Sequence, residues 1–208
     1  MDYEHIDFNI HHPEPLLIVI SGPSGVGKDS VVKALKMSHT PFHFVVTATS
    51  RAPRVGEVNG VDYFFITKEE FERMAAEDEL LEHSLVYDQH KGIPKQQVRE
   101  ALASGLDTVM RIDVQGAAKV RAICPEAVLV FMVPSSAKEL YERLAERETE
   151  TVESLKLRMD SAIQEMKCVD QFDYVVVNET YRLEECAATI LAIIRAEHHR
   201  NPHRKITL

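Results

Sequence analysis

Short apolar runs alternate along the chain with segments in which apolar residues recur at the spacing of a helix face. The apolar runs predict strands at 16–20, 44–49, 61–66, 80–87, 108–112, 127–133 and 174–177. The segments between them predict helices at 28–37, 67–77, 95–104, 115–123, 136–146 and 183–199, and one more that follows a charged stretch at 147–153 and runs to about 169. Because strands and helices alternate, the pattern predicts an α/β fold, with a parallel sheet flanked by helices on both faces.

The same pattern sets three stretches apart from the rest of the chain. Residues 1–15 are polar and rich in His and Pro, and we expect a loose arm there. Residues 45–93 carry more strand signals and fewer helix signals than their surroundings, which predicts an inserted, strand-rich lobe. The basic end of the chain, 201–208, is expected to be frayed.

Composition narrows the class of protein. Hydrophobic residues make up 45% of the 208 and charged residues 27%, which is typical of a globular protein. No run approaches the roughly 20 apolar residues of a membrane span, and the N-terminus lacks the layout of a secretory signal, so we expect a cytoplasmic protein without a membrane partner. The net charge of −9 disfavours a nucleic-acid polymer but allows a small anion held by local arginines. The three cysteines are far apart and predict neither disulfides nor a zinc site.

A glycine-rich loop follows the first predicted strand directly. It reads Gly22-Pro23-Ser24-Gly25-Val26-Gly27-Lys28-Asp29-Ser30, the G-x-x-x-x-G-K pattern between a buried strand and a helix. The glycines allow backbone conformations that aim successive N–H groups at phosphate oxygens, and the helix dipole adds positive potential there. Lys28 supplies a point charge for the β- and γ-phosphates. The loop therefore predicts a P-loop NTPase-type sheet that binds ATP.

The residue after the lysine departs from this pattern. Asp29 stands where a hydroxyl usually ligates Mg²⁺, and Ser30 comes one step later. A carboxylate is also a hard oxygen ligand, so Asp29 is a candidate ligand for Mg²⁺. The same charge could instead repel the nucleotide, and the sequence leaves both readings open.

Two further motifs lie downstream of the loop. One begins at Thr47 and contains R-A-P-R-V-G-E-V-N-G-V-D-Y, with Arg51, Arg54 and Tyr63; the other is Ile112-Asp113-Val114-Gln115-Gly116, and Glu82 lies between them. Together with the P-loop they resemble the guanylate kinase family. The resemblance covers 16–197, and it implies a core at 16–44 and 94–197, an acceptor-binding lobe at about 45–93, a helical lid at about 143–158 and a tail at 198–208.

The resemblance implies roles for the residues of these motifs. Thr47, Arg51, Arg54 and Tyr63 would hold the phosphate of an acceptor nucleotide, GMP, and Glu82 and Asp113 would read its guanine. The chemistry agrees, because two arginines can clamp a phosphate through forked hydrogen bonds. A carboxylate can accept the adjacent N1–H and N2–H₂ donors of guanine, whereas adenine presents an acceptor at N1.

A third cluster of cations lies in the region of the implied lid. Arg143 and Arg147 are four residues apart and Arg158 follows on the next helix, so the family's phosphate-closing arginines match these positions. Such arginines would neutralise charge on the transferring group and exclude water. A salt-bridged helix surface is the alternative, because Glu139, Glu142 and Glu146 are close in sequence. Asn178 matches the family's adenine-side loop.

Three positions depart from the family pattern on the acceptor side. Lys91 replaces a tyrosine that contacts phosphate, and its ammonium could still do so. Ile93 replaces a hydroxyl that would bond guanine O6, which predicts weaker base discrimination through the loss of one hydrogen bond. Arg111 replaces an acid before Ile112-Asp113, which would either change the charge near the metal or exchange a metal ligand for a phosphate contact.

The sequence thus predicts a guanylate kinase that transfers the γ-phosphoryl group of ATP to GMP with Mg²⁺, as a monomer or homodimer. A relative that phosphorylates ribose 1,5-bisphosphate is one alternative, because its P-loop also reads G-K-D-S. A non-catalytic guanylate kinase-like binding module is another. Such modules tend to lack the lysine and lid arginines, which are present here as Lys28, Arg143, Arg147 and Arg158.

Overall fold

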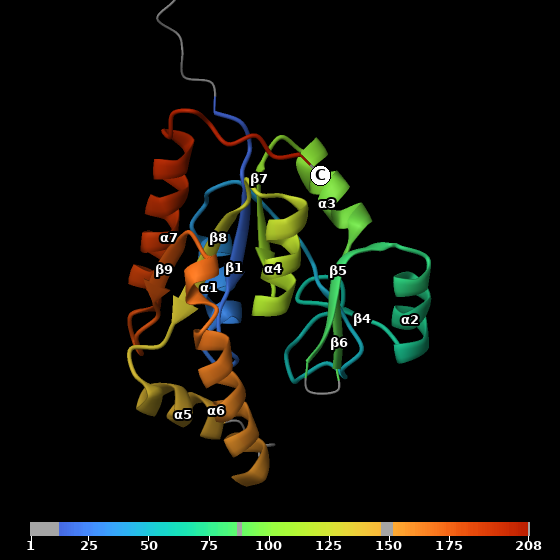
Figure 1. The fold of residues 1–208 in the computed structure, drawn as a ribbon, viewed down its shortest axis with the longest axis vertical. Helices are drawn as coiled ribbons and strands as arrows, with labels where there is room; N and C mark the ends of the chain where they lie inside the picture. The colour runs from blue at the N-terminus through green and yellow to red at the C-terminus, as the bar shows by residue number, and fades with distance from the viewer. Residues whose placement is uncertain (1–12, 87–88, 147–151, 208) are drawn as a thin grey trace, which may run out of the picture.

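The computed structural model describes residues 13–86, 89–146 and 152–207 (Figure 1). Its main sheet has five parallel strands in the order β2-β7-β1-β8-β9. These strands are β1 (Leu17–Ser21), β2 (Phe42–Phe44), β7 (Asp107–Arg111), β8 (Val128–Val133) and β9 (Tyr174–Val177). The predicted parallel α/β sheet is confirmed.

Helices cover both faces of this sheet, which explains why β1 is apolar at nearly every position. Ile18 and Ile20 point into a core shared with α1 (Lys28–Met37) and α7 (Leu183–His198). Leu17 and Val19 point into a second core, shared with α3 (Lys95–Ala103) and α4 (Val114–Ile123). All of β1 is buried, because a strand in the middle of a doubly covered sheet has no solvent face.

A second, smaller sheet lies beside the main one (Figure 1, right). Its order is β4-β3-β6-β5, in which β5 (Leu80–Val86) and β6 (Gln89–Pro94) are antiparallel and β3 (Ala48–Thr49) and β4 (Phe64–Phe65) are short. Helix α2 (Lys68–Ala76) covers it through Phe71. The hydroxyl of Thr67 accepts the N–H of Glu70, so the predicted helix start is confirmed.

Helices α5 (Ala137–Ala145) and α6 (Val152–Met166) form a pair at the lower end of the molecule in Figure 1. They join through a small apolar cluster of Leu140, Leu144 and Ala162. A 3₁₀ turn at Val169–Gln171 leads from α6 to β9. This cluster is separate from the two cores of the main sheet, so the helix pair has its own packing unit.

The sequence pattern misplaced strands in the smaller sheet. The single strand predicted at 44–49 is wrong, because the chain leaves the main sheet after β2 and enters the second sheet only at β3. The strand predicted at 61–66 shortens to β4. Strand β6 was missed, because Lys91, Gly92 and Pro94 are poor strand formers and its pairing with β5 compensates for them.

The end of the chain is ordered by specific contacts, so the prediction of a frayed tail is wrong. Arg204 is buried and donates from Nε to Glu197 Oε2 at 2.7 Å, while Tyr174 donates its hydroxyl to Glu197 Oε1 at 2.6 Å. Ile206 packs against the core under α3 and α4. Basic composition indicated exposure, but a buried carboxylate on α7 supplies the partner. Within the part of the chain that the structure describes, no helix has the length and apolarity to span a bilayer.

Candidate active site

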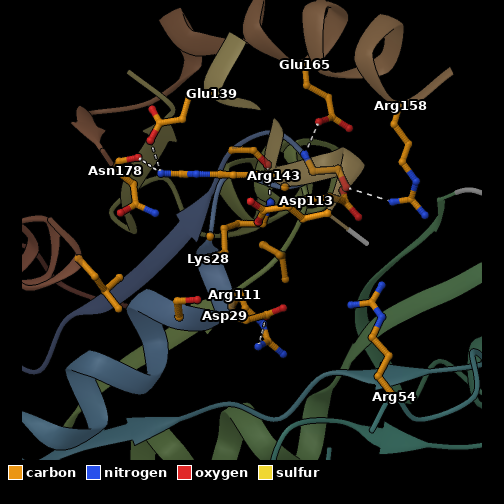
Figure 2. A pocket seen from close by; sticks show the side chains of 18 of the residues that line it. Lys28, Asp29, Arg54, Arg111, Asp113, Glu139, Arg143, Arg158, Glu165 and Asn178 are labelled. Carbon is orange, nitrogen blue, oxygen red and sulfur yellow. Dashed lines mark hydrogen bonds and ion pairs between the residues drawn. The ribbon is translucent and has the colours of Figure 1, made fainter. Parts of the chain in front are cut away.

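A cavity of about 810 Å³ opens where the main sheet, the smaller sheet and the α5–α6 pair meet (Figure 2). It lies at the carboxyl end of β1, which is where open α/β sheets bind ligands. Most of the predicted site residues line it, together with several that were not predicted. The lining includes Gly22, Ser24, Gly25, Gly27, Lys28, Asp29, Ser30, Thr47, Arg51, Arg54, Tyr63, Glu82, Lys91, Arg111, Asp113, Glu139, Arg143, Arg158, Glu165 and Asn178.

The turn from β1 to α1 has the backbone of a phosphate cradle. Gly22 has φ 138°, and a Cβ atom there would lie 2.3 Å from the carbonyl oxygen of Met132. Gly27 is the N-cap of α1 with φ 94°, and a Cβ atom would lie 2.4 Å from Asn178 Nδ2. No other residue fits these two positions, because both positive φ and lack of space exclude a side chain. Gly27, Lys28, Asp29 and Ser30 line the cavity, so the N-terminus of α1 faces it, and a helix N-terminus favours a bound anion.

The Lys28 ammonium is folded back onto the loop. Nζ donates to the carbonyl oxygens of Gly22 at 2.5 Å and Pro23 at 3.1 Å. Burial lowers the pKa of Lys28 to about 8, although the nearby Glu165 carboxylate opposes the shift. A cation that is poorly solvated gains much from an incoming anion, so this lysine is prepared for a polyphosphate.

A carboxylate from α6 occupies part of the cradle. The backbone N–H of Ser24 donates to Glu165 Oε2 at 3.1 Å, and Arg158 Nη1 donates to the Ser24 hydroxyl at 3.5 Å (Figure 2). Burial raises the pKa of Glu165, against the attraction of Lys28. Sequence analysis missed Glu165, because a lone glutamate on an amphipathic helix carries no local signal. The contact ties the α5–α6 pair to the loop.

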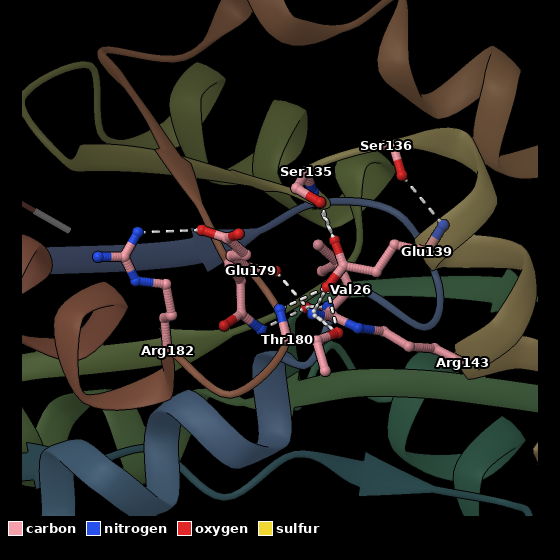
Figure 3. A network of polar contacts seen from close by, with 9 residues as sticks. Val26, Ser135, Ser136, Glu139, Arg143, Glu179, Thr180 and Arg182 are labelled. Carbon is pink, nitrogen blue, oxygen red and sulfur yellow. Dashed lines mark hydrogen bonds and ion pairs between the residues drawn. The ribbon is translucent and has the colours of Figure 1, made fainter.

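The predicted lid arginine Arg143 is a structural anchor in this state (Figure 3). Its guanidinium donates to the carbonyl oxygens of Val26 at 3.1 Å and Asn178 at 2.8 Å, and to Glu139 Oε1 at 2.7 Å. Asn178 Nδ2 also donates to Val26 at 2.7 Å. The predicted Arg143 and Asn178 thus meet at the loop. Arg147 lies outside the described residues.

Glu139 organises this network, although only a surface role was considered for it. Burial disfavours its charge, but hydrogen bonds from Ser135 and Thr180 outweigh burial and lower the pKa of Glu139 to about 2. The carboxylate therefore stays ionised and holds Arg143 beside the loop. Glu139 lies in the first turn of α5, four residues before Arg143, and this spacing is the sequence feature that could have predicted their ion pair.

Across the cavity, Arg51 is fixed and Arg54 is exposed. Arg51 binds Glu57 through both terminal nitrogens, at 2.7 and 2.6 Å, and this hydrogen bonding lowers the pKa of Glu57 to about 2. The Arg51 guanidinium also lies 4.8 Å from the Tyr63 ring centre. Arg54 reaches toward the cavity from the side of the smaller sheet (Figure 2). Thr47 is buried and donates to the Arg111 carbonyl at 3.4 Å.

The two residues predicted to read guanine, Glu82 and Asp113, both line the cavity but differ in their hydrogen bonding. Glu82 is 4% exposed, and its Oε2 has no hydrogen-bond partner within the described part of the chain. Burial, reinforced by Asp113, raises the pKa of Glu82 to about 8. Asp113 instead caps α4, accepting the N–H groups of Gln115 and Gly116 at 2.9 Å each, and accepts the Ser84 hydroxyl at 2.6 Å.

The three departures from the family pattern have different surroundings. Ile93 is fully buried in the core under α3 and α4, and it is not among the cavity's lining residues. Lys91 lines the cavity, and burial lowers the pKa of its ammonium. Arg111 forms an ion pair with Asp29 in the first turn of α1, which neither residue alone predicted. Asp29 and Arg111 both depart from the usual motif residues, and the joint departure is the sequence feature that could have indicated their contact.

A strand, a glycine loop and a lysine-bearing helix at the carboxyl edge of a parallel sheet define a P-loop nucleotide-binding protein. The model of the guanylate kinase family matches residues 14–197. Guanylate kinase 2, chloroplastic/mitochondrial, of Oryza sativa subsp. japonica is 52% identical over 186 residues, which are 89% of this chain and 65% of that protein. A guanylate kinase of Clostridium perfringens is 46% identical over 182 residues, 88% of this chain and 83% of that protein.

Solved structures agree with these sequence relatives. The crystal structure of guanylate kinase from Anaplasma phagocytophilum matches with a TM-score of 0.73 and 31% identity, and the match covers 90% of this chain and 88% of that one. The chain belongs to the guanylate kinase family.

Proposed function

We propose that this protein is a guanylate kinase, which transfers the γ-phosphoryl group of ATP to GMP and yields ADP and GDP. The observation that carries the assignment is the pairing of two different anion sites in one cavity, the second of them beside a base-reading carboxylate. An amide cradle with Lys28 lies at one end. Arg51 and Arg54 lie at the other, together with the buried Glu82, whose Oε2 has no hydrogen-bond partner among the described residues. Family membership supports the same activity.

The donor, ATP, binds at the P-loop. The backbone of Gly22, Pro23, Ser24, Gly25, Val26 and Gly27 surrounds the β- and γ-phosphates, and Lys28 turns from the loop carbonyls to meet them. Asn178, already bonded to Val26, lies on the adenine side. Glu165 leaves the Ser24 amide when phosphate arrives, because two anions do not share one N–H group.

The acceptor, GMP, binds under the smaller sheet. Arg51 and Arg54 bind its phosphate with help from Thr47, Lys91 and the phenol of Tyr63, whose pKa burial raises so that it stays protonated and donates. Glu82 accepts from guanine N1–H and N2–H₂, which satisfies the unbonded Oε2. Asp113 supports the base from the start of α4, where its own carboxylate is held by three donors.

The transfer needs little proton chemistry. An oxygen of the GMP phosphate attacks the γ-phosphorus, a P–O bond forms to GMP as the bond to the β-bridging oxygen breaks, and that oxygen leaves with ADP. The nucleophile is already an anion, so catalysis consists of positioning and charge neutralisation. Lys28, Arg143, Arg147 and Arg158 supply the positive charge around the moving group.

Mg²⁺ fits the oxygen donors beside the loop as a cation that arrives with ATP. Among the described residues, no group of three His, Cys, Asp or Glu side chains is placed to hold a metal ion. Asp29 and the Ser30 hydroxyl would hold Mg²⁺ together with the phosphates, which is the usual arrangement for this ion. When bound, it would neutralise charge on the phosphates.

The experiment is an acceptor panel with purified protein and Mg·ATP. GMP, AMP, UMP and ribose 1,5-bisphosphate are offered separately, and ADP release is measured against a reaction without acceptor. We expect rapid release with GMP alone. Release with ribose 1,5-bisphosphate but not GMP would overturn the assignment in favour of the sugar kinase. Tight nucleotide binding without release for any acceptor would favour the binding module.

A further inference from the structure

Arg111 joins three segments that are far apart in the sequence. It is the last residue of β7, and its Nη1 donates to Asp29 Oδ1 in the first turn of α1. Its Nη2 donates to the carbonyl oxygen of Asp62 at 3.0 Å. Its guanidinium carbon lies 4.4 Å from the centre of the Tyr63 ring. One side chain thus links the donor loop's helix to the part of the chain that carries the acceptor site.

The linkage is well shielded on the arginine side. The Arg111 side chain is 13% exposed, whereas that of Asp29 is 46% exposed. A guanidinium that stacks on an aromatic ring and donates in two directions has a fixed orientation, which lysine cannot reproduce. Asp29 is the carboxylate that compensates this buried charge.

The stack continues to the acceptor's arginine. Tyr63 is 8% exposed, and Arg51 lies 4.8 Å from the same ring that Arg111 contacts. Arg51 is in turn fixed by Glu57. A continuous series of contacts therefore runs from Asp29 through Arg111 and Tyr63 to Arg51.

We propose that Asp29 and Arg111 act as one positioning pair for the acceptor site, holding Tyr63 and Arg51 in the orientation that binds the acceptor phosphate. The inference rests on the proposed function. Asp29 belongs to the donor loop by its position in the sequence. The proposal gives it a role at the acceptor end of the cavity. Removing the Asp29 carboxylate therefore lowers the affinity for GMP more than it lowers the affinity for the nucleotide bound at the loop.

The test is a double-mutant cycle on GMP binding. Asp29→Asn, Arg111→Met and the double variant are titrated calorimetrically with GMP, and separately with ADP in the presence of EDTA, so that no metal is involved. Each single variant should bind GMP about tenfold more weakly, and the double variant should lose little more, because one linkage is being broken twice. Metal-free ADP affinity should change by less than about twofold.

Each control variant makes the same substitution at an exposed position away from the cavity. Asp160→Asn on α6 and Arg195→Met on α7 should leave both affinities unchanged. Arg111→Lys keeps the charge but not the two-way donation or the stacking, so its GMP affinity should be intermediate. Thermal unfolding shows whether Arg111→Met folds, and the half-exposed Asp29→Asn keeps the test valid if it does not.

The outcomes separate this inference from the function on which it rests. If the unaltered protein does not bind GMP, the proposed function is wrong and the inference fails with it. If the unaltered protein binds GMP but Asp29→Asn binds it equally well, or the two single losses add, the pair does not position the acceptor site. A further titration of each variant with ADP and Mg²⁺ completes the test, and a loss of affinity seen only there would make Asp29 a metal ligand alone.

Discussion

The two ends of the cavity are built in different ways. The donor end is one contiguous stretch, residues 22–30, in which the backbone itself binds and the glycine at position 27 opens a helix. The acceptor end is assembled from the smaller sheet, the end of β7 and the start of α4, and it binds through side chains. The donor end is therefore defined by local conformation, and the acceptor end by tertiary contacts.

This difference affects how each end responds to change. A backbone cradle tolerates few substitutions at its glycines, and its shape depends little on distant side chains. A side-chain site depends on supporting partners, such as Glu57 for Arg51 and Arg111 for Tyr63. We expect variants at the donor end to abolish transfer, and variants at the acceptor end to change affinity and selectivity in graded steps.

The largest effect is expected for Lys28→Ala. The change removes the cation that meets the β- and γ-phosphates, so kcat should fall about 10²–10³-fold or more, with the fold intact. Steady-state ADP release measures it, and circular dichroism and thermal unfolding provide the control for folding. Unaltered transfer in this variant would contradict the assigned chemistry.

A smaller effect is expected on the acceptor side, and two arginines provide a matched pair. Arg51→Met should raise the KM for GMP by about 10²-fold, because a fixed forked donor is lost, while the KM for ATP changes little. Arg54→Met removes the same charge from an exposed side chain and should raise the KM for GMP less. Steady-state kinetics with each substrate varied in turn gives the KM for GMP and the KM for ATP of both variants. Equal effects of the two substitutions would show that the Glu57 contact does not matter.

The raised pKa of Glu82 predicts that GMP binding depends on pH. With the pKa raised to about 8, most of the carboxylate is protonated at pH 7, and GMP requires it ionised, so binding releases a proton. Affinity for GMP should therefore increase about fivefold to tenfold between pH 7 and 8.5, where the GMP phosphate has already lost its second proton. Calorimetry in buffers of different ionisation enthalpy counts the proton.

Glu82→Gln is the matched variant for this measurement. It should bind GMP more weakly at every pH and should lose the dependence between pH 7 and 8.5. A pH dependence that persists in this variant would place the titrating group elsewhere.

The smallest effect is a gain. Glu165→Gln removes the negative charge that sits on the Ser24 amide and faces incoming phosphate, so affinity for ADP should increase by about threefold. Asp160→Asn makes the same change in charge at an exposed position of the same helix and should have no effect. Calorimetric titration with ADP compares the two. Unchanged or weaker binding by Glu165→Gln would show that the carboxylate does not compete with phosphate.

The contrast between a locally defined donor end and an acceptor end built by tertiary contacts also explains how much the sequence could predict. The alternation of strands and helices predicted the main sheet, and the P-loop could be placed residue by residue, because both signals are local. The smaller sheet was harder, because Ala48–Thr49 and Gln89–Pro94 become strands through pairing with each other and with β5. Glu165 and the Asp29–Arg111 pair acquire their roles from partners distant in sequence, and Glu139 acquires part of its role from the distant Thr180. Assembly as monomer or homodimer and the cytoplasmic location stay predictions.

The measurement that tests the two-ended site most directly is a crossed binding experiment. ADP and GMP are each titrated into the unaltered protein, Lys28→Ala and Arg51→Met. We predict that Lys28→Ala loses ADP affinity and keeps that for GMP, while Arg51→Met loses GMP affinity and keeps that for ADP. Loss of both nucleotides in either folded variant, or of the opposite nucleotide, would contradict two separate anion sites in one cavity.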